Sequence, residues 1–302
     1  MSGPTDEAVR LAAFAGLFYP ADAGECRSLA ASYVGSGRES SPSPGAQRWM
    51  GGIVPHAGWM CSGAIAGLTV GSIARSWKQA QPGVVVVFAA IHTPLPTEVA
   101  ALDTFAAWTA PVDRTEIAIE LRSRLAQCAA RFRADDRFHS REHAVEVELP
   151  LIRAAWPDAM VLPVEVPVIE GAIEIGADVA RTVGAMGLDA VYLASSDLTH
   201  YGPTYRFAPA GLGLAGLEWA KKNDRRLLDR VERLDTRAIV AEVRQNLNAC
   251  GGGAIAAMLA ACRERGASQA RILRHASSYE TLRGVAEQSP DNAVGYASAV
   301  VG

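Results

Sequence analysis

Three histidines of this chain each follow the end of a predicted β-strand. His56 follows the apolar stretch 51–54, His92 follows 84–91, and His200 comes shortly after 191–194. In open α/β sheets, the loops at the carboxyl edge of the strands form the crevice that binds ligands and metals. Imidazole is also a ligand of divalent transition metals and a proton shuttle near neutral pH. These histidines therefore predict one site built from distant segments.

Cys250 is a fourth residue that fits such a site. Three glycines follow it, and then an apolar stretch from about Ala254 that is typical of a helix. A thiol at a helix N-terminus faces unpaired N–H groups and the positive end of the helix dipole, which favour the metal-binding thiolate. The glycines do not predict a phosphate loop, because the Walker lysine and the GxGxxG spacing are missing.

Each of these residues also has a plain structural interpretation. A histidine after a strand is often a hydrogen-bonding group of a loop or the core, and Cys250 alone is often a small buried apolar residue. Asp197, three residues before His200, either orients it for catalysis or caps a turn. Cys61 either approaches the site, where a disulfide with Cys250 would block it, or is a packing thiol.

His143 and Glu146 are spaced three residues apart, so they could share one helix face as metal ligands. We favour a structural pair, because Glu142, Glu146 and Glu148 together suit an exposed face. His139 and His275 have no supporting context.

Apolar runs alternate with amphipathic stretches along the chain. The expected helices cover about 63–77, 142–156 with a kink at Pro150, 172–186, 218–231, 236–245 and 254–265, and further strands cover 160–166, 271–274 and 294–301. This alternation predicts an α/β fold, a three-layer αβα sandwich with a largely parallel central sheet. We expect a single domain over residues 1–302, with a surface loop at 35–45 and a lid over the site at 201–216.

Composition narrows the class of protein. The 302 residues are 49% hydrophobic, and a net charge of −3 gives no basic surface for nucleic acid. Five scattered cysteines without a CxxC pair argue against a disulfide framework, and the apolar stretch 11–19 is too short for a signal or a membrane span. We expect a cytoplasmic enzyme that contacts neither nucleic acid nor membrane.

Six short motifs are spread over nearly the whole chain. They are Phe18–Asp22, Val54–Trp59, Glu142–Pro150, Ser195–Gly202, Ala249–Gly251 and Val294–Ser298. The same motifs occur in this order in the Memo family, which the chain resembles. That family is similar in fold to the class III extradiol ring-cleaving dioxygenases, which use non-haem Fe(II). The resemblance implies a metal ion held by His56, His92 and Cys250, with His200 beside it as an acid/base.

The chain also departs from the family pattern. Cys250-Gly251-Gly252 replaces a usual Cys-Gly-Arg, so a cation is missing, and Thr93 follows His92 where a second histidine is usual. Trp59 and Cys61 stand where tyrosines are common. These changes leave the implied ligands intact and alter the pocket wall.

Two functions follow from the resemblance together with the residues. The first is a non-haem Fe(II)-dependent oxidoreductase that acts with O2 on a small, for example aromatic, substrate, with His200 moving a proton and Asp197 orienting it. The alternative is a non-catalytic protein that binds a metal, including copper or zinc, or a (phospho)peptide. The missing arginine argues mildly against phosphate capture. The sequence does not identify the substrate or the native metal. It is compatible with a homo-oligomer and does not fix the oligomeric state.

Overall fold

The centre of the fold is a set of four parallel strands. The computed structural model describes residues 8–40, 48–78, 80–286 and 289–302. Strands β2 (Gly51–Val54), β9 (Ala190–Ser195), β3 (Val84–Ala89) and β8 (Met160–Glu165) lie side by side in this order. In β3, four consecutive valines, a phenylalanine and an alanine are all buried, as expected of a strand with helices on both faces.

The outer strands make the sheet mixed. Within the described residues it has nine strands: β10 (His200–Tyr201), β12 (Ala293–Val301), the four central strands, β4 (Ala100–Leu102) and β7 (Phe132–Ala134), with β11 (Ala270–Ser277) paired to β12. β12 runs antiparallel to β2, β10 and β11, and β4 runs antiparallel to β8. The prediction of a largely parallel sheet therefore holds for its centre and for the edge pair β4–β7, but not for the other outer strands. β11 and β12 are joined by a short segment with the four-residue helix α9 (Ser278–Thr281), not by a crossover helix.

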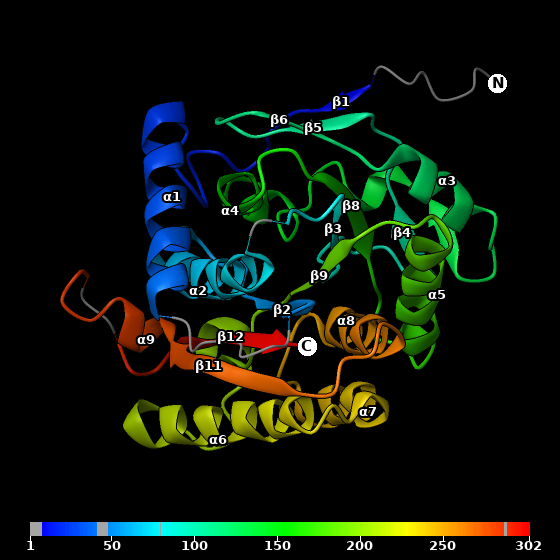
Figure 1. Ribbon diagram of the computed structural model, residues 1–302. Coiled ribbons are helices and arrows are strands. Elements are labelled where there is room, and N and C mark those ends of the chain that lie inside the picture. Colours follow the sequence, from blue (N-terminus) through cyan, green and yellow to red (C-terminus); the bar gives the residue numbers. More distant parts are fainter. Residues whose placement is uncertain (1–7, 41–47, 79, 287–288) are drawn as a thin grey trace.

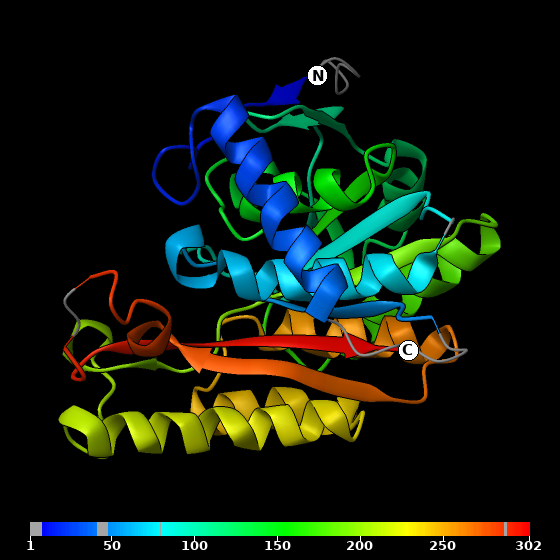
Figure 2. The same ribbon diagram turned by 60° about the vertical axis from the view of Figure 1, so that its left-hand side comes forward.

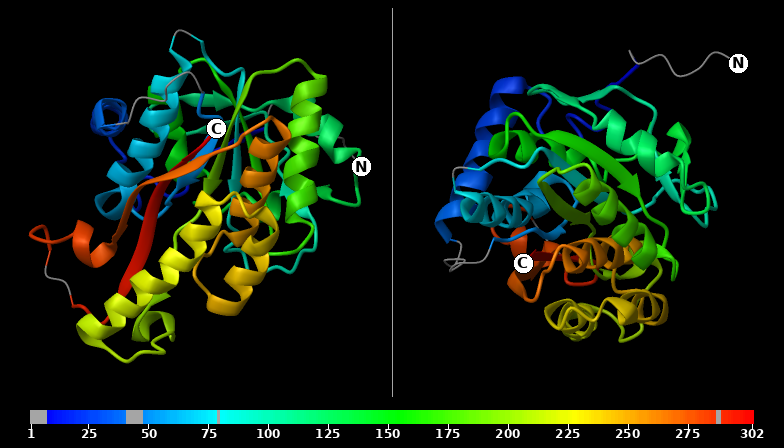
Figure 3. Two further views of the ribbon diagram at one scale, coloured as in Figure 1. Left: turned by 60° about the horizontal axis from the view of Figure 1, so that its bottom comes forward. Right: turned by 45° about the vertical axis from the view of Figure 1, so that its right-hand side comes forward.

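Helices cover both faces of this sheet. Val85 and Val87 point to the face covered by α1 (Ala23–Ser40), α2 (Trp59–Trp77) and α4 (Leu149–Ala155). Val84 and Val86 point to the face covered by α5 (Ala172–Ala185), α6 (Gly213–Glu232), α7 (Thr236–Asn246) and α8 (Gly252–Glu264). Figure 1 shows this arrangement, and Figure 2 shows β12, in red, between α2 above and α6 below. Figure 3 shows α7 alongside α8, and α6 packs against α7.

The remaining elements are short. β1 (Val9–Arg10), β5 (Ala107–Thr109) and β6 (Arg114–Glu116) form a second sheet. The helix α3 (Ile119–Ala126) follows β6 in the sequence. Single 3-10 turns occur at η1 (Asp136–Phe138), η2 (Glu146–Glu148) and η3 (Pro203–Tyr205). Of the helices in the described ranges, none combines the length and apolar character that a membrane span needs.

The predicted loop at 35–45 is wrong over its first half. Residues 35–40 are the last turns of α1, and residues 41–47 lie outside the described part of the chain. One glycine that suggested a loop, Gly37, has a packing role instead, together with Gly71 of α2. A Cβ at Gly37 would collide with the carbonyl oxygen of Gly67 in α2, and one at Gly71 would collide with that of Val34. Glycine therefore lets the backbones of α1 and α2 approach closely.

Two other boundaries differ from the sequence-based expectation. The helix expected at 142–156 begins only at Leu149, with Pro150 in its first turn, where a proline costs no hydrogen bond. The segment expected to be a lid at 201–216 ends earlier, because α6 begins at Gly213. Its irregular part contains η3 and a left-handed residue, Arg206.

Candidate metal centre

The ligand atoms of His56, His92 and Cys250 lie within 4.8 Å of one another. The sheet explains why these distant residues meet. Val54 at the end of β2 and Ala89 at the end of β3 both pair with Ser195 at the end of β9, so the following loops leave the sheet at one level. Cys250 reaches the same place from the start of α8, and its backbone N–H donates to the carbonyl of Asp197.

His56 presents its Nε2 atom to this centre. Its Nδ1 lies 2.8 Å from the hydroxyl of Ser195, and that hydroxyl donates to the carbonyl of Ala144 at 2.6 Å. Ser195 therefore accepts from Nδ1–H, which leaves the lone pair on Nε2, 3.3 Å from the Cys250 sulfur. Burial, together with the neighbouring His143 and His92, holds the pKa of His56 well below its usual value, so the ring is neutral. Neutral imidazole is the form that binds metals.

His92 is oriented by a buried carboxylate. Its backbone N–H donates to Glu142 Oε2 at 2.8 Å, and its Nδ1 lies 2.9 Å from Glu142 Oε1. This contact leaves Nε2 of His92 for the centre. Burial lowers the pKa of His92, but hydrogen bonds with Cys250 and Glu142 raise it to about 10, so a metal ion at this centre would have to displace the proton on Nε2.

Glu142 is held as an anion by its donors. Besides His92, it accepts from the backbone N–H groups of His143 and Ala144, at 2.8 and 3.1 Å. Burial raises the pKa of Glu142, but hydrogen bonds from His143 and His92 outweigh this and hold it well below its usual range. Glu142 and Ser195 are the residues that sequence reasoning missed. The signal available was general: a metal-binding histidine almost always donates its other nitrogen to a carboxylate, carbonyl or water.

His143 belongs to the same site, whereas Glu146 does not. The His143 ring lies 5.1 Å from that of His56 and 4.6 Å from that of His92. Its Nδ1 lies 3.1 Å from Glu142 Oε1, which is a hydrogen-bonding distance, so Glu142 and His143 are better described as a hydrogen-bonded group beside His92 than as ligands of a second metal ion. Glu146 forms an ion pair with Arg10.

The interpretation of an exposed glutamate face is wrong. Glu142, Glu146 and Glu148 are all buried, with at most 1% of their surface exposed. Residues 139–148 form turns rather than an exposed helix, and Glu142 and Glu146 each accept from a donor that lies far away in the sequence, His92 and Arg10 respectively.

Asp197 and His200 lie at the end of β9 and just beyond it. Asp197 Oδ1 accepts from the backbone N–H of His56 at 2.9 Å, and burial raises the pKa of Asp197 to about 7. His200 Nδ1 lies 3.0 Å from the carbonyl of Leu198, and its ring packs edge-on against Tyr205 at 5.0 Å. Burial lowers the pKa of His200. The structure thus shows Leu198, not Asp197, contacting Nδ1 of His200, while Asp197 anchors the loop of His56.

Cys61 packs beside this region. It lies against a small apolar cluster that includes Ile65, Val294 and Tyr296, and burial raises the pKa of its thiol, while a hydrogen bond with Tyr296 opposes that shift. Cys61 and Cys250 are both free thiols.

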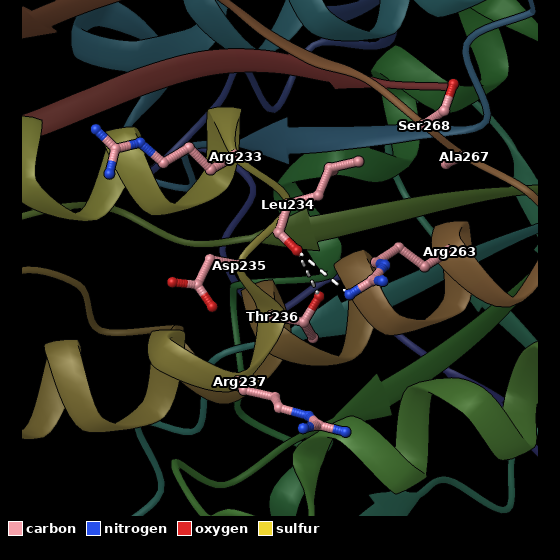
Figure 4. Close-up of a pocket in the computed structure, with 8 residues that line it drawn as sticks. All are labelled: Arg233, Leu234, Asp235, Thr236, Arg237, Arg263, Ala267 and Ser268. Atoms are coloured by element: carbon pink, nitrogen blue, oxygen red, sulfur yellow. Dashed lines mark hydrogen bonds between the residues drawn. The ribbon is translucent and has the colours of Figure 1, made fainter.

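A hollow on the surface lies elsewhere. It has a volume of about 710 Å³ and lies between the α6–α7 turn and the end of α8. Figure 4 shows Arg263 directed at the carbonyl of Leu234, while Arg233 and Arg237 extend away from the centre. The hollow has no histidine or cysteine in its lining. The residues suited to metal chemistry are those at the carboxyl edge of the sheet.

Comparisons with known proteins identify the family of this chain. A family model described as Memo-like protein matches residues 10–300. A MEMO1 family protein of Thermococcus kodakarensis is 29% identical over 97% of this chain and 99% of its own length. A MEMO1 family protein of Methanopyrus kandleri is 30% identical over 96% of this chain and 98% of its own length. Among solved structures, an uncharacterized protein of Escherichia coli K12 has a TM-score of 0.46 and 13% identity, covering 76% of this chain and 92% of that one. This last likeness is too distant to assign the fold.

Proposed function

This chain belongs to the Memo-like protein family, and we propose that it is a metal-binding, non-haem Fe(II)-dependent oxidoreductase. Its fold would resemble that of the class III extradiol dioxygenases, and its substrates would be O2 and a small, for example aromatic, molecule. The observation that carries the proposal is the convergence of His56, His92 and Cys250, whose ligand atoms lie within 4.8 Å of one another.

The donor set fits a metal ion. Both histidines use Nδ1 to contact a protein acceptor, so both Nε2 atoms remain for coordination. Three protein donors leave coordination positions open, where a bound iron(II) ion would bring O2 and substrate together. The thiolate takes the place of the carboxylate of the usual two-histidine facial triad, and this softer donor also suits copper or zinc.

The remaining residues have roles that follow from their contacts. His200 lies near the centre with its Nδ1 against a carbonyl, so its Nε2 is the atom that would exchange a proton with the substrate. Its lowered pKa favours the neutral, proton-accepting form at neutral pH. Asp197 holds the backbone of His56, and Ser195 and Glu142 hold the two rings.

The test begins with metal content. Protein purified without added metal is analysed for iron, copper and zinc, and is then loaded anaerobically with Fe(II). Oxygen uptake is measured against a panel of catechols and aminophenols. We expect about one metal ion per chain and uptake with at least one compound. Failure to bind any of these metals stoichiometrically would refute the proposal.

A second candidate is metal binding without turnover. The thiolate donor favours this candidate because it also suits copper and zinc, which a protein can hold without catalysing a reaction. Phosphopeptide capture has less support. Gly252 stands where the family usually has an arginine, the side chain best suited to bidentate contacts with phosphate. A firmly held zinc or copper ion with no oxygen uptake would favour metal binding without turnover over the oxidoreductase. Tight phosphopeptide binding would show that the non-catalytic protein also binds peptides.

A further inference from the structure

The N-terminal segment (residues 10–19) is fastened to the loop that carries His143. Arg10 donates to the carbonyls of His139 and Glu142, at 2.7 and 2.8 Å, and to the Glu146 carboxylate at 2.6 Å. Glu146 also accepts from the backbone N–H of Phe14 and the hydroxyl of Tyr19, both at 2.8 Å. One fully buried carboxylate thus binds both ends of this segment.

The conformation of the segment directs two rings toward the site. Gly16, with a φ of +81°, allows a tight turn in which the N–H of Phe18 donates to the carbonyl of Phe14. The ring of Phe18 lies 4.6 Å from the His143 ring, and that of Phe14 lies 5.5 Å from it. Leu17, between them in sequence, is 78% exposed. The carbonyl of Phe18 also accepts from the N–H of Trp59, three residues after His56.

Ring contacts therefore run without a break from the segment to the proposed ligands. Phe14 and Phe18 pack on His143, and His143 packs on His56 and His92. We call Phe14, Phe18 and His143 the aromatic wall. Both phenylalanines are only partly buried, so part of each residue remains exposed to solvent.

We infer that the aromatic wall contacts the substrate and that Glu146 is a positioning residue, which acts by holding Phe14 and Phe18 in place. This inference rests on the proposed function. Aromatic faces select flat rings, so the wall favours a planar, conjugated substrate over an aliphatic one. Glu146 itself touches neither the proposed ligands nor any substrate, because its oxygens are occupied by Arg10 and residues 13–19.

The test uses Co(II)-loaded protein and 4-nitrocatechol, a flat ring whose absorbance changes when it binds a metal centre. The variants are Phe18→Leu, which keeps an apolar side chain without the ring, and Glu146→Gln. Leu17→Ala, in the same segment, is the matched control. We expect cobalt content and affinity to match the wild type in all variants. Affinity for 4-nitrocatechol should fall roughly 5- to 10-fold in Phe18→Leu and by a smaller factor in Glu146→Gln, and stay unchanged in Leu17→Ala.

Two results would overturn the inference while the metal proposal stands. One is that Phe18→Leu binds cobalt normally and also binds 4-nitrocatechol as tightly as the wild type does. The same conclusion follows if the wild type binds cobalt but does not bind 4-nitrocatechol at all. The other is a parallel loss of cobalt in Phe18→Leu, which would make the ring a support of the ligands rather than a contact of the substrate. Failure of the wild type to bind cobalt at all would instead refute the metal site itself.

Discussion

At the scale of single residues, the histidines have separable roles. His56→Ala and His92→Ala should each remove most bound metal, because each would supply one of only three protein ligands. His200→Ala should keep its metal and lose turnover by about 10²- to 10⁴-fold, since its role is proton transfer. Metal content per chain, measured beside oxygen uptake, checks this division. Equal loss of metal in His200→Ala and His56→Ala would make His200 a ligand and contradict our assignment.

Glu142 offers a second test at this scale. Glu142→Gln should weaken metal affinity about 10- to 100-fold, because the amide cannot accept from all the N–H groups that now orient His92. Glu146→Gln is the matched control, since it changes a buried glutamate of the same loop that contacts neither proposed ligand. Competition with a chromophoric chelator measures both affinities. The same affinity in the two variants would remove Glu142 from any role in orienting His92.

The residues that could be predicted differ physically from those that could not. His56 and His92 were predictable because a position just after a parallel strand fixes which edge of the sheet a residue reaches. Glu142 and Ser195 were not, because their contacts arise only when loops 50 and 139 residues away in sequence close over them. Glu146 follows the same logic, since its partners lie 127–136 residues away.

At the scale of elements, one helix provides an internal comparison between two glycines. Gly37→Ala should destabilise the protein by about 1–3 kcal/mol, because the new methyl group would collide with the backbone of α2. Gly35→Ala, half a turn earlier in α1, meets no atom within 4 Å and should stabilise by roughly 0.5–1 kcal/mol. Urea unfolding of both variants checks the pair. Equal effects would mean that α1 and α2 do not pack this closely.

The same helix explains which elements escaped prediction. Apolar periodicity identified α5, α6 and α7 to within a few residues, because each buries one face, and a continuous apolar run identified α8, which is buried on all sides from Gly252 to Cys262. Glycine and serine are weak helix formers, so residues 35–40 predict a loop, but tertiary packing overrides that preference and they end α1. The direction of β4 and β12 depends on how their connections cross the sheet, and residue types do not encode this.

At the scale of the whole molecule, the proposed metal ion would join segments that are otherwise far apart in the chain. Its ligands follow β2, follow β3 and precede α8, so coordination would tie the centre of the sheet to a helix on one face. Unfolding would separate all three ligands. Metal binding is therefore linked to global stability rather than to the order of one loop.

This linkage gives the last prediction. At a free metal concentration of 100 times Kd, binding should add about 2.7 kcal/mol to the free energy of unfolding. For 302 residues with an unfolding entropy of about 2 cal/mol/K each, that raises Tm by roughly 4 °C. Differential scanning fluorimetry with Fe(II) under anaerobic conditions, or with Co(II), measures the shift. His200→Ala should show the full shift, and His92→Ala should show almost none. A similar rise in both variants would place the stabilising ion at another site, because only one of the two substitutions removes a proposed ligand.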